Sequence, residues 1–403
     1  MKSLSNEYDL VIVGGGIAGS TLARVMSGCG ASTLVIEKEE RFKDRVRGDG
    51  MTSWGAGLAR DLGIYDLLLD QCGHELPMLD IFVNGAQIAN RNLIETTPGK
   101  TPFFTFFHPA MQEALLSAAE SAGATVARGV QACGVTLGAS PSVAIRNDEG
   151  VTEVRARLVV GADGRTSAVR KWAGFPVKHD EEHLVIAGVL MEHIDTSVDT
   201  ASLYFNPEAG KAAYFFPQRN KRVRAYAVHH VDQTTKLSGS RQVARFLQIV
   251  AEAGVPPETI REARAVGPLA SFNGAAYWVP QPYRQGVTLI GDAAASSDPV
   301  WGEGLSLALQ DVRILSERLS ADPDWNRAAA SYAQEHERRF AVNHDICNWY
   351  AEFFLRTGVE ASLARARAFP KLAQDPTRVP DLFALGSDTP NDELARARFF
   401  GEV

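Results

Sequence analysis

Three glycine-containing turns hold the residues of this chain whose types and spacing could do chemistry. In chain order they are Gly14, Gly16 and Gly19, then Asp163 and Gly164, then Gly291 and Asp292. A glycine backbone can approach a phosphate closely, and a neighbouring carboxylate can accept hydrogen bonds from sugar hydroxyls. These residue types are therefore candidates for nucleotide binding.

The first turn matches a Gly-x-Gly-x-x-Gly phosphate-binding motif because of the elements predicted around it. An apolar strand is predicted for residues 8–13, and apolar residues continue at helical spacing after the turn. The first glycine permits the tight turn, the second lets the backbone approach a pyrophosphate, and the third lets helix pack on strand. A second strand, predicted for residues 33–36, ends at Glu37, where a ribose hydroxyl needs an acceptor. This unit by itself does not separate NAD from FAD.

The other two turns also follow predicted strands. A strand at 157–160 precedes the Asp163 turn, and a strand at 287–290 precedes the Gly291 turn. The third turn is followed by Pro299, by Gly302-Glu303-Gly304 and by a helical pattern. Such turns are common in loops when taken singly, but three in this order are far less expected by chance.

Through these motifs the chain resembles the FAD-dependent aromatic hydroxylases typified by para-hydroxybenzoate hydroxylase, the group A flavin monooxygenases. Flavin halogenases and geranylgeranyl reductases are related to them. The resemblance spans about residues 7–320 and implies an α/β fold. In it, a glutathione reductase-like Rossmann FAD-binding domain is interleaved with a β-sheet substrate domain, and C-terminal helices follow. The implied cofactors are FAD, tightly held, and NADPH or NADH as a transient electron donor, since no second Gly-x-Gly-x-x-Gly unit is present.

The resemblance also implies roles for individual residues. Glu37 would hold the adenosine ribose, Asp292 the ribityl chain, and Pro299 would border the isoalloxazine ring. The residues implied for cofactor binding are Gly14, Gly16, Ala18, Gly19, Glu37, Lys38, Arg47, Asp163, Gly164, Gly291, Asp292, Pro299, Gly302, Gly304 and Leu305. No catalytic acid or base stands out, and the candidates beside the flavin are Pro299, Gly302, Gly304, Tyr214 and Arg47.

The sequence departs from the family pattern at three positions. Ala295 stands where a histidine often follows the Gly-Asp-Ala-Ala run, and Ser306 stands where an asparagine is usual. His108 occupies the place of an arginine that commonly opens the helix before the Asp-Gly strand. We expect FAD binding to survive these changes.

The choice of flavin chemistry depends on shorter segments. Halogenases carry a Trp-x-Trp-x-Ile-Pro stretch, and the closest segment here, 212–217, lacks both tryptophans. The expected function is a monooxygenase that uses NAD(P)H and O2, through a flavin C4a-hydroperoxide, to hydroxylate or epoxidise an aromatic or polycyclic small molecule. The alternatives are a reductase of an unsaturated lipid, because 302–304 and 47–50 resemble geranylgeranyl reductases equally, and a flavin-binding ligand sensor without turnover.

A hydroxylase of this kind needs an apolar, aromatic-lined chamber that excludes water and positions the substrate. The candidate lining residues are Trp54, Phe103, Phe104, Phe106, Tyr204, Tyr214, Phe216 and Tyr226. A sheet that carries part of this lining is predicted from strands at 200–206, 212–216 and 223–229.

Because motifs far apart in the sequence must meet at one ligand, the FAD-binding domain is predicted to be discontinuous. It comprises 1–75, 107–172 and 279–322, with a substrate domain at 76–106 and 173–278 and a C-terminal helical extension at 323–403.

Composition excludes several other classes of function. The formal net charge of -7 over 403 residues argues against nucleic acid as a partner. The four cysteines form no CxxC pair, and His179 and His183 precede a predicted strand rather than lie on one helix, so we predict no metal site. No segment reaches the ~18 apolar residues of a membrane helix. We therefore expect a cytoplasmic protein that acts on a small molecule, without stable membrane association.

Overall fold

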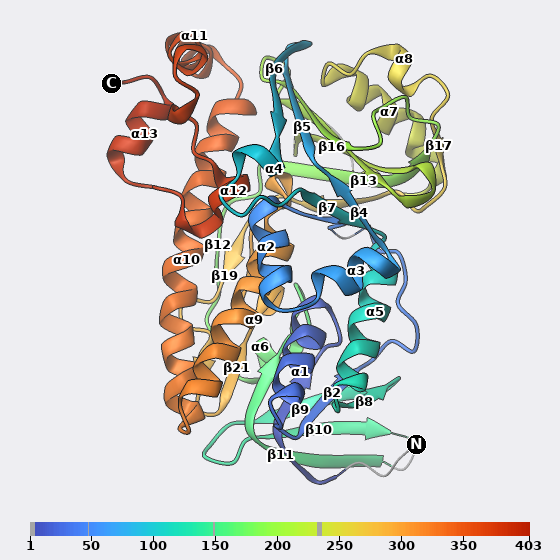
Figure 1. Ribbon diagram of the computed structural model, residues 1–403, viewed down its shortest axis with the longest axis vertical. Helices are drawn as coiled ribbons and strands as arrows, with labels where there is room; N and C mark the ends of the chain where they lie inside the picture. Colours follow the sequence, from blue (N-terminus) through green and yellow to red (C-terminus); the bar gives the residue numbers. More distant parts are fainter. Residues whose placement is uncertain (1–4, 47, 148–149, 232–235) are drawn as a thin grey trace.

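The computed structural model describes residues 5–46, 48–147, 150–231 and 236–403, and Arg47 lies outside them. Two eight-stranded sheets form its body, one above the other in Figure 1. Beside them lies the long helix α10 (Trp325–Phe354). The α/β fold class with C-terminal helices predicted from the sequence is confirmed.

The first sheet has a parallel centre with strand order β21-β11-β1-β2-β8. The strands are β1 (Glu7–Val13), β2 (Thr33–Glu37), β8 (Thr125–Arg128), β9 (Gln131–Thr136), β10 (Ser142–Asn147), β11 (Gly150–Gly161), β20 (Tyr283–Arg284) and β21 (Val287–Leu289). The strands and the helix predicted around the first glycine turn are confirmed by β1, β2 and α1 (Ile17–Gly28).

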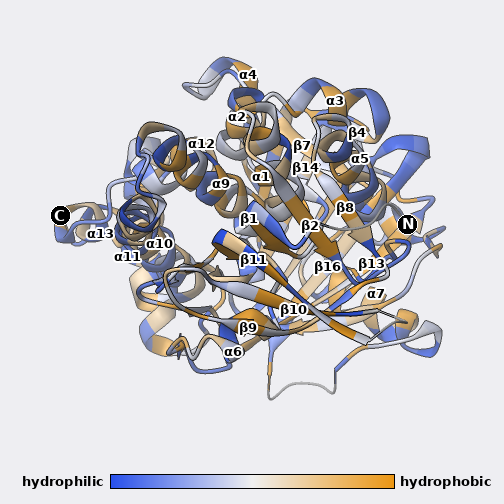
Figure 2. Cartoon of the chain, turned by 90° about the horizontal axis from the view of Figure 1, so that it is seen from below, coloured by the Kyte–Doolittle hydropathy of each residue, from blue (hydrophilic) through white to orange (hydrophobic). Residues whose placement is uncertain are grey.

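Alternation along β1 gives this sheet a core on each side. Leu10 and Ile12 pack with α1, α5 (His108–Ser121) and α9 (Gly304–Ala321). Val11 and Val13 face the opposite side, where residues of β9 and β10 cover them. Figure 2 shows the hydrophobic colour gathered on β1 and β2 beside α1.

The second sheet has the strand order β17-β13-β16-β15-β14-β5-β6, with β18 paired to β13. Its strands are β5 (Met78–Val83), β6 (Ala86–Asn92), β13 (Leu184–Glu192), β14 (Thr200–Asn206), β15 (Lys211–Gln218), β16 (Arg222–His230), β17 (Arg264–Ala265) and β18 (Ala270–Asn273). Strands β14, β15 and β16 confirm the three that were predicted. One face packs against α7 (Val243–Glu252). We call the other the inner face; it carries Leu203 and Tyr214 and packs with residues of α10.

Two small sheets and several short helices connect these layers. Strands β3 (Gly50–Met51), β7 (Phe103–Phe106) and β4 (Gly73–Leu76) form one, and β12 (Lys178–His179), β19 (Tyr277–Trp278) and β22 (Ala295–Ser296) form the other. The short helices are α2 (Ser53–Asp61), α3 (Tyr65–Gln71), α4 (Leu93–Thr96), α6 (Ala168–Trp172) and α8 (Pro257–Ile260).

The C-terminal helices join the two layers. The first part of α10 packs in the core of the first sheet through Ala329 and Tyr332, and its later part packs under the second sheet through Ile346 and Phe353. Helices α11 (Val359–Gln374), α12 (Leu382–Leu385) and α13 (Glu393–Phe399) follow. No helix in the described ranges is long and apolar enough to cross a membrane. The domain boundaries given above stay a prediction.

Candidate functional site

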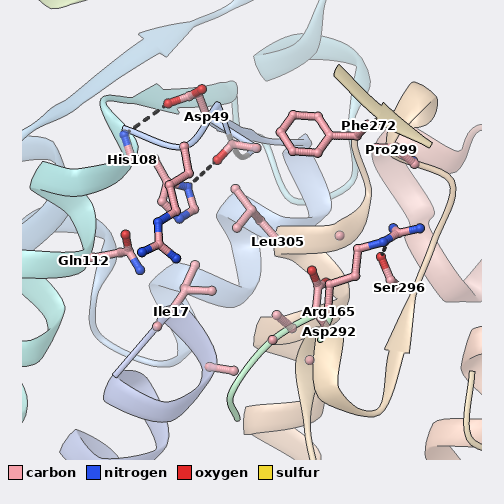
Figure 3. Close-up of a pocket in the computed structure, with 18 of the residues that line it drawn as sticks. Ile17, Asp49, His108, Gln112, Arg165, Phe272, Asp292, Ser296, Pro299 and Leu305 are labelled. Atoms are coloured by element: carbon pink, nitrogen blue, oxygen red, sulfur yellow. Dashed lines mark hydrogen bonds between the residues drawn. The ribbon is translucent and has the colours of Figure 1, made fainter. Parts of the chain in front are cut away.

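A cavity of about 490 Å³ joins the carboxyl ends of the parallel strands to the inner face of the second sheet. Val13, Glu37 and Gly291 line it from the first sheet and its turns, and Leu203 and Tyr226 line it from the second. Ligands of open parallel sheets bind beyond the carboxyl ends of the strands. All three predicted turns contribute to this one cavity, part of which is shown in Figure 3.

Each glycine of the first turn is required for a different reason. A Cβ on Gly14, whose φ is +110°, would lie 2.4 Å from the carbonyl oxygen of Ala162, so any side chain would collide with the neighbouring turn. A Cβ on Gly19 would lie 2.0 Å from the carbonyl oxygen of Gly14. Only a glycine at this position therefore allows the helix to pack so closely on the strand. A Cβ on Gly16 would meet no atom within 4 Å and would project into open space at the N-terminus of α1. This arrangement leaves room for a phosphate at Gly16.

Glu37 is buried and is held by backbone donors. Its Oε2 accepts the Gly15 N–H at 2.7 Å, and its Oε1 accepts the Glu39 N–H at 2.8 Å. Each carboxylate oxygen can accept a further hydrogen bond. Lys38, next along the chain, is exposed and also lines the cavity.

The second turn divides its roles between two residues. Asp163 Oδ2 accepts the Ala168 N–H at 2.6 Å, and its Oδ1 accepts the Ser167 hydroxyl at 2.5 Å, so this carboxylate stabilises the start of α6. Gly164 lines the cavity, and a Cβ there would meet no atom within 4 Å. Asp163 also lines the cavity, so this turn offers both an open backbone at Gly164 and a carboxylate held by protein donors.

Buried side chains fix the backbone of the third turn. The Gly291 N–H donates to Asp311 Oδ2 at 2.8 Å, and the Tyr277 hydroxyl donates to the Asp292 carbonyl oxygen at 2.6 Å. Arg170 donates to the next carbonyl, that of Ala293, at 3.0 Å. With its backbone held in this way, the turn places Asp292 in the cavity wall.

The segment from Asp298 to Gly304 turns the chain into helix α9. Asp298 Oδ1 accepts the Val300 N–H at 2.9 Å, and Gly302 has a φ of +73°, which glycine adopts readily. Pro299, Gly302, Gly304 and Leu305 all line the cavity. The N-terminus of this 18-residue helix therefore places its partial positive charge at the cavity.

Two acids in this segment are buried. Desolvation raises the pKa of Asp298 to about 7 and that of Glu303 to about 8. Glu303 is 0% exposed, and its Oε2 accepts a hydrogen bond from Trp54 Nε1 at 2.7 Å. Sequence analysis did not predict this network, because Trp54 was expected to line the substrate chamber.

The loop between β2 and β3 is anchored by a buried charge network. Arg224, which is 0% exposed, places Nε 2.7 Å from Asp49 Oδ2 and Nη2 3.0 Å from Asp44 Oδ2. The Tyr226 hydroxyl donates to Asp49 Oδ2 at 3.2 Å, and the His108 N–H donates to Asp49 Oδ1 at 3.0 Å (Figure 3). Burial raises the pKa of Asp49 to about 6, and the charge of Arg224 opposes this rise.

The same loop contains a strained residue. Val46 is buried with a φ of +53°, which is unfavourable for a β-branched side chain. Val46 packs onto Gly188 of β13, where a Cβ would lie 2.7 Å from Val46 Cγ1. Strain of this kind persists only where surrounding contacts enforce it. The loop is thus fixed against the second sheet at the edge of the cavity.

His108 also contacts the loop between β2 and β3. Its Nδ1 lies 2.6 Å from the carbonyl oxygen of Gly48, and the residue lines the cavity together with Gln112 (Figure 3). On another side of the cavity, Arg165 donates to Ser296 Oγ at 2.9 Å (Figure 3).

Four of the eight aromatic residues predicted for the chamber line it: Phe103, Tyr214, Phe216 and Tyr226. The other four do not: Trp54, Phe104, Phe106 and Tyr204. For the three that lie on strands, the alternation of side chains explains why they do not line the cavity, because neighbours on a strand face opposite sides. Phe104 and Phe106 enter the core of the first sheet, and Tyr204 faces α7. Sequence reasoning missed Phe205, Phe272, Trp301 and Phe383; the alternation that excludes Tyr204 is the signal that selects Phe205.

Among the described residues no group of three or more His, Cys, Asp or Glu side chains is arranged to hold a metal ion. His179 lies on β12 and is exposed, and His183 is also exposed.

Comparisons with known proteins agree with this geometry. A family model described as FAD binding domain matches residues 7–347. The chain is 29% identical over 340 residues to ubiquinone hydroxylase UbiL of Rhodospirillum rubrum. This alignment covers 78% of this chain and 72% of that protein. It is 25% identical over 358 residues to digeranylgeranylglycerophospholipid reductase 1 of Methanococcoides burtonii, covering 86% and 83%. The solved structure of p-nitrophenol 4-monooxygenase PnpA from Pseudomonas putida has a TM-score of 0.77 at 17% identity, covering 92% of this chain and 94% of that one.

Proposed function

The chain belongs to the FAD binding domain family and is an FAD-dependent oxidoreductase, and from this premise we propose that it is a monooxygenase of an aromatic or polycyclic small molecule. NADPH or NADH would supply the electrons and O2 the oxygen atom. The observation that carries the proposal is that one cavity joins the three glycine turns to an aromatic wall on the second sheet.

The residues of the site fit FAD. Gly16, Gly164 and Gly302 each line the cavity at points where even a Cβ would meet no atom within 4 Å, so a large ligand can approach the backbone there. Glu37 would hold the adenosine ribose, and Asp292 the ribityl chain. When bound, FAD supplies hydride acceptance and the activation of O2.

The protein's own part is positioning, water exclusion and electrostatics. Phe103 and Phe216, whose rings stack at 5.0 Å, present a flat apolar surface to a ring substrate. The N-terminus of α9 stabilises negative charge that develops near Gly304. The Tyr226 hydroxyl donates a hydrogen bond to Asp49. This bond holds the aromatic ring at the cavity wall and ties the wall to the loop between β2 and β3.

Reduction of an unsaturated lipid is the second candidate. The relative from Methanococcoides burtonii matches most of this chain, and an apolar cavity wall accepts an isoprenoid chain as well as a ring. The third alternative from the sequence analysis is a flavin-binding ligand sensor without turnover.

An assay in the presence and absence of O2 separates these functions. FAD-loaded protein would be mixed with NADPH or NADH and a panel of ring compounds, and flavin bleaching and product would be followed. A monooxygenase bleaches faster with its substrate and incorporates one atom of 18O2 into the product. Product formed without O2 would establish the reductase instead. Failure of every donor to bleach the flavin, with any ligand present, would refute both enzymatic proposals.

A further inference from the structure

Glu303 directly precedes helix α9, but its side chain does not cap that helix. The carboxyl accepts no hydrogen bond from the N–H groups of the first turn. It turns instead toward the start of α2, where it accepts hydrogen bonds from Trp54 Nε1 at 2.7 Å and Thr52 Oγ1 at 3.3 Å. The N–H groups of the first turn have no partner inside the helix, so they are left for other acceptors.

A negative charge on Glu303 would be buried without compensation. Its Oε1 is shielded from solvent and has no hydrogen-bond partner among the described residues, and within them the carboxyl forms no ion pair. The titratable groups that interact with it are Cys347 and Tyr350 of α10, and Asp298 also interacts with Cys347. Burial raises the pKa of the thiol and of the phenol, and Glu303 raises both further, so these two groups stay neutral. Ionising a buried group that has no partner is costly.

The position of Glu303 couples this cost to the cavity. Gly302 and Gly304, on either side of it in the chain, both line the cavity, whereas Glu303 lies behind the cavity wall. A negative charge on the carboxyl and a negative charge on a ligand at these glycines would therefore act on the same end of α9. Like charges in a desolvated site raise each other's affinity for protons. Protonation of Glu303 and the charge of a cofactor bound at this edge must then depend on each other.

We propose that Glu303 is a redox-tuning residue, which takes up a proton from solvent when FAD is reduced and so keeps a second negative charge away from this edge of the cavity. NADPH or NADH delivers two electrons and one proton, which leave the reduced cofactor with one negative charge. Where the Glu303 carboxylate is ionised beforehand, it binds one further proton, so reduction takes up two protons instead of one. The inference rests on the proposed placement of FAD against Gly302 and Gly304.

The reduction potential of the FAD-loaded protein tests this proposal. It is measured under argon against a reference dye from pH 6.5 to pH 9.5, for the parent protein and for Glu303→Gln. Protons bound by the flavin itself affect both proteins alike, so the difference between them isolates Glu303. We expect equal potentials below pH 7 and a lower potential for the parent protein above pH 8. At pH 9.5 the ratio of reduced to oxidised flavin should differ about tenfold, which is about 30 mV for a two-electron couple.

Three further variants separate Glu303 from its surroundings. Glu258→Gln removes an exposed carboxylate and should follow the parent protein at every pH. Asp298→Asn removes the neighbouring buried acid and should keep the steeper pH dependence above pH 8. Trp54→Phe removes a hydrogen bond that lowers the pKa of Glu303, so the steeper region should begin about one pH unit higher. This last variant keeps the test valid if Glu303→Gln fails to fold.

Two results would overturn the inference. One is a difference in potential between Glu303→Gln and the parent protein that stays constant with pH, and the other is a steeper region that survives in Glu303→Gln but disappears in Asp298→Asn. The proposed function fails by a different result, because these potentials are measured without O2 or substrate. If they behave as expected and no oxygenated product is found with any substrate, the role of Glu303 stands and the monooxygenase assignment falls.

Discussion

Replacing Glu303 with Gln should change how the stability of the protein depends on pH. The Glu303 carboxyl is 0% exposed, and its Oε2 accepts hydrogen bonds from Trp54 Nε1 at 2.7 Å and Thr52 Oγ1 at 3.3 Å. A glutamine has the same shape, can keep both hydrogen bonds through its carbonyl oxygen and does not titrate. The substitution therefore isolates the cost of keeping this acid protonated.

The magnitude follows from the difference between the folded and unfolded pKa values. Burial raises the pKa of Glu303 from 4.5 to about 8. Between these two pH values the folded protein holds a proton that the unfolded chain has released, so the stability due to this group is present below pH 4.5 and is lost as pH rises toward 8. The slope is about 1.4 kcal/mol per pH unit, which amounts to about 2–3 kcal/mol between pH 5 and pH 7. Above pH 8 the difference levels off.

Urea titrations of FAD-saturated protein at pH 5, 6, 7 and 8 measure this effect. As pH rises from 5 to 7, we expect the free energy of unfolding of Glu303→Gln to increase relative to that of the parent protein by about 2–3 kcal/mol. Glu258→Gln, which removes an exposed carboxylate from α8, controls for the loss of one charge. A stability difference that stays constant over this range would show that Glu303 is ionised in the folded protein and would refute the reasoning.

Three further predictions concern the cofactor turns and the loop beside them. Arg224→Met leaves Asp49 buried without its cation and should lower the free energy of unfolding by about 3–5 kcal/mol, with partial recovery when Asp49→Asn is added; a loss under about 1 kcal/mol in urea titrations contradicts this. Gly16→Val fills the open space at the start of α1, and fluorescence titration should show FAD affinity at least about tenfold weaker with the melting temperature of the apoprotein little changed. Asp292→Ala should lower the flavin content of the purified protein, and undiminished occupancy would reject its assignment to the ribityl chain.

The elements around the first turn were predictable because their signals are local. An apolar strand, three glycines at fixed spacing and a helical pattern lie within about thirty residues, and β1, α1 and β2 follow them closely. The meeting of the three turns was also predictable, since each follows a strand and parallel strands place their carboxyl ends along one edge. The hydrogen bonds of individual side chains within those turns were less predictable. The Asp163 carboxylate, for example, accepts hydrogen bonds at the start of α6 as well as lining the cavity. Its spacing to Ser167 was a signal that could have indicated this.

The buried network beside the cavity could not be predicted, because its members are far apart in the sequence. Arg224 and Asp49 are 175 positions apart, and the segment around Arg224 alternates charged and apolar residues like a half-exposed strand. Arg222 lies on the same face of β16 yet is only partly buried, with its Nε 3.4 Å from Glu192. The difference between the two arginines arises from the loop between β2 and β3, which packs over Arg224 only. No local pattern encodes that contact.

The formal charge of the segment before α9 also differs from the charge it carries when folded. Counted from the sequence, Asp298 and Glu303 place two negative charges beside the helix N-terminus. Burial raises their pKa values to about 7 and about 8, so near neutral pH the pair bears only a fraction of those charges. An ionised pair would cancel the positive end of α9, whereas a protonated pair leaves it available to negative charge in the cavity. Desolvation of these two acids, and not the residue types alone, therefore determines how much negative charge lies beside the N-terminus of α9 near neutral pH.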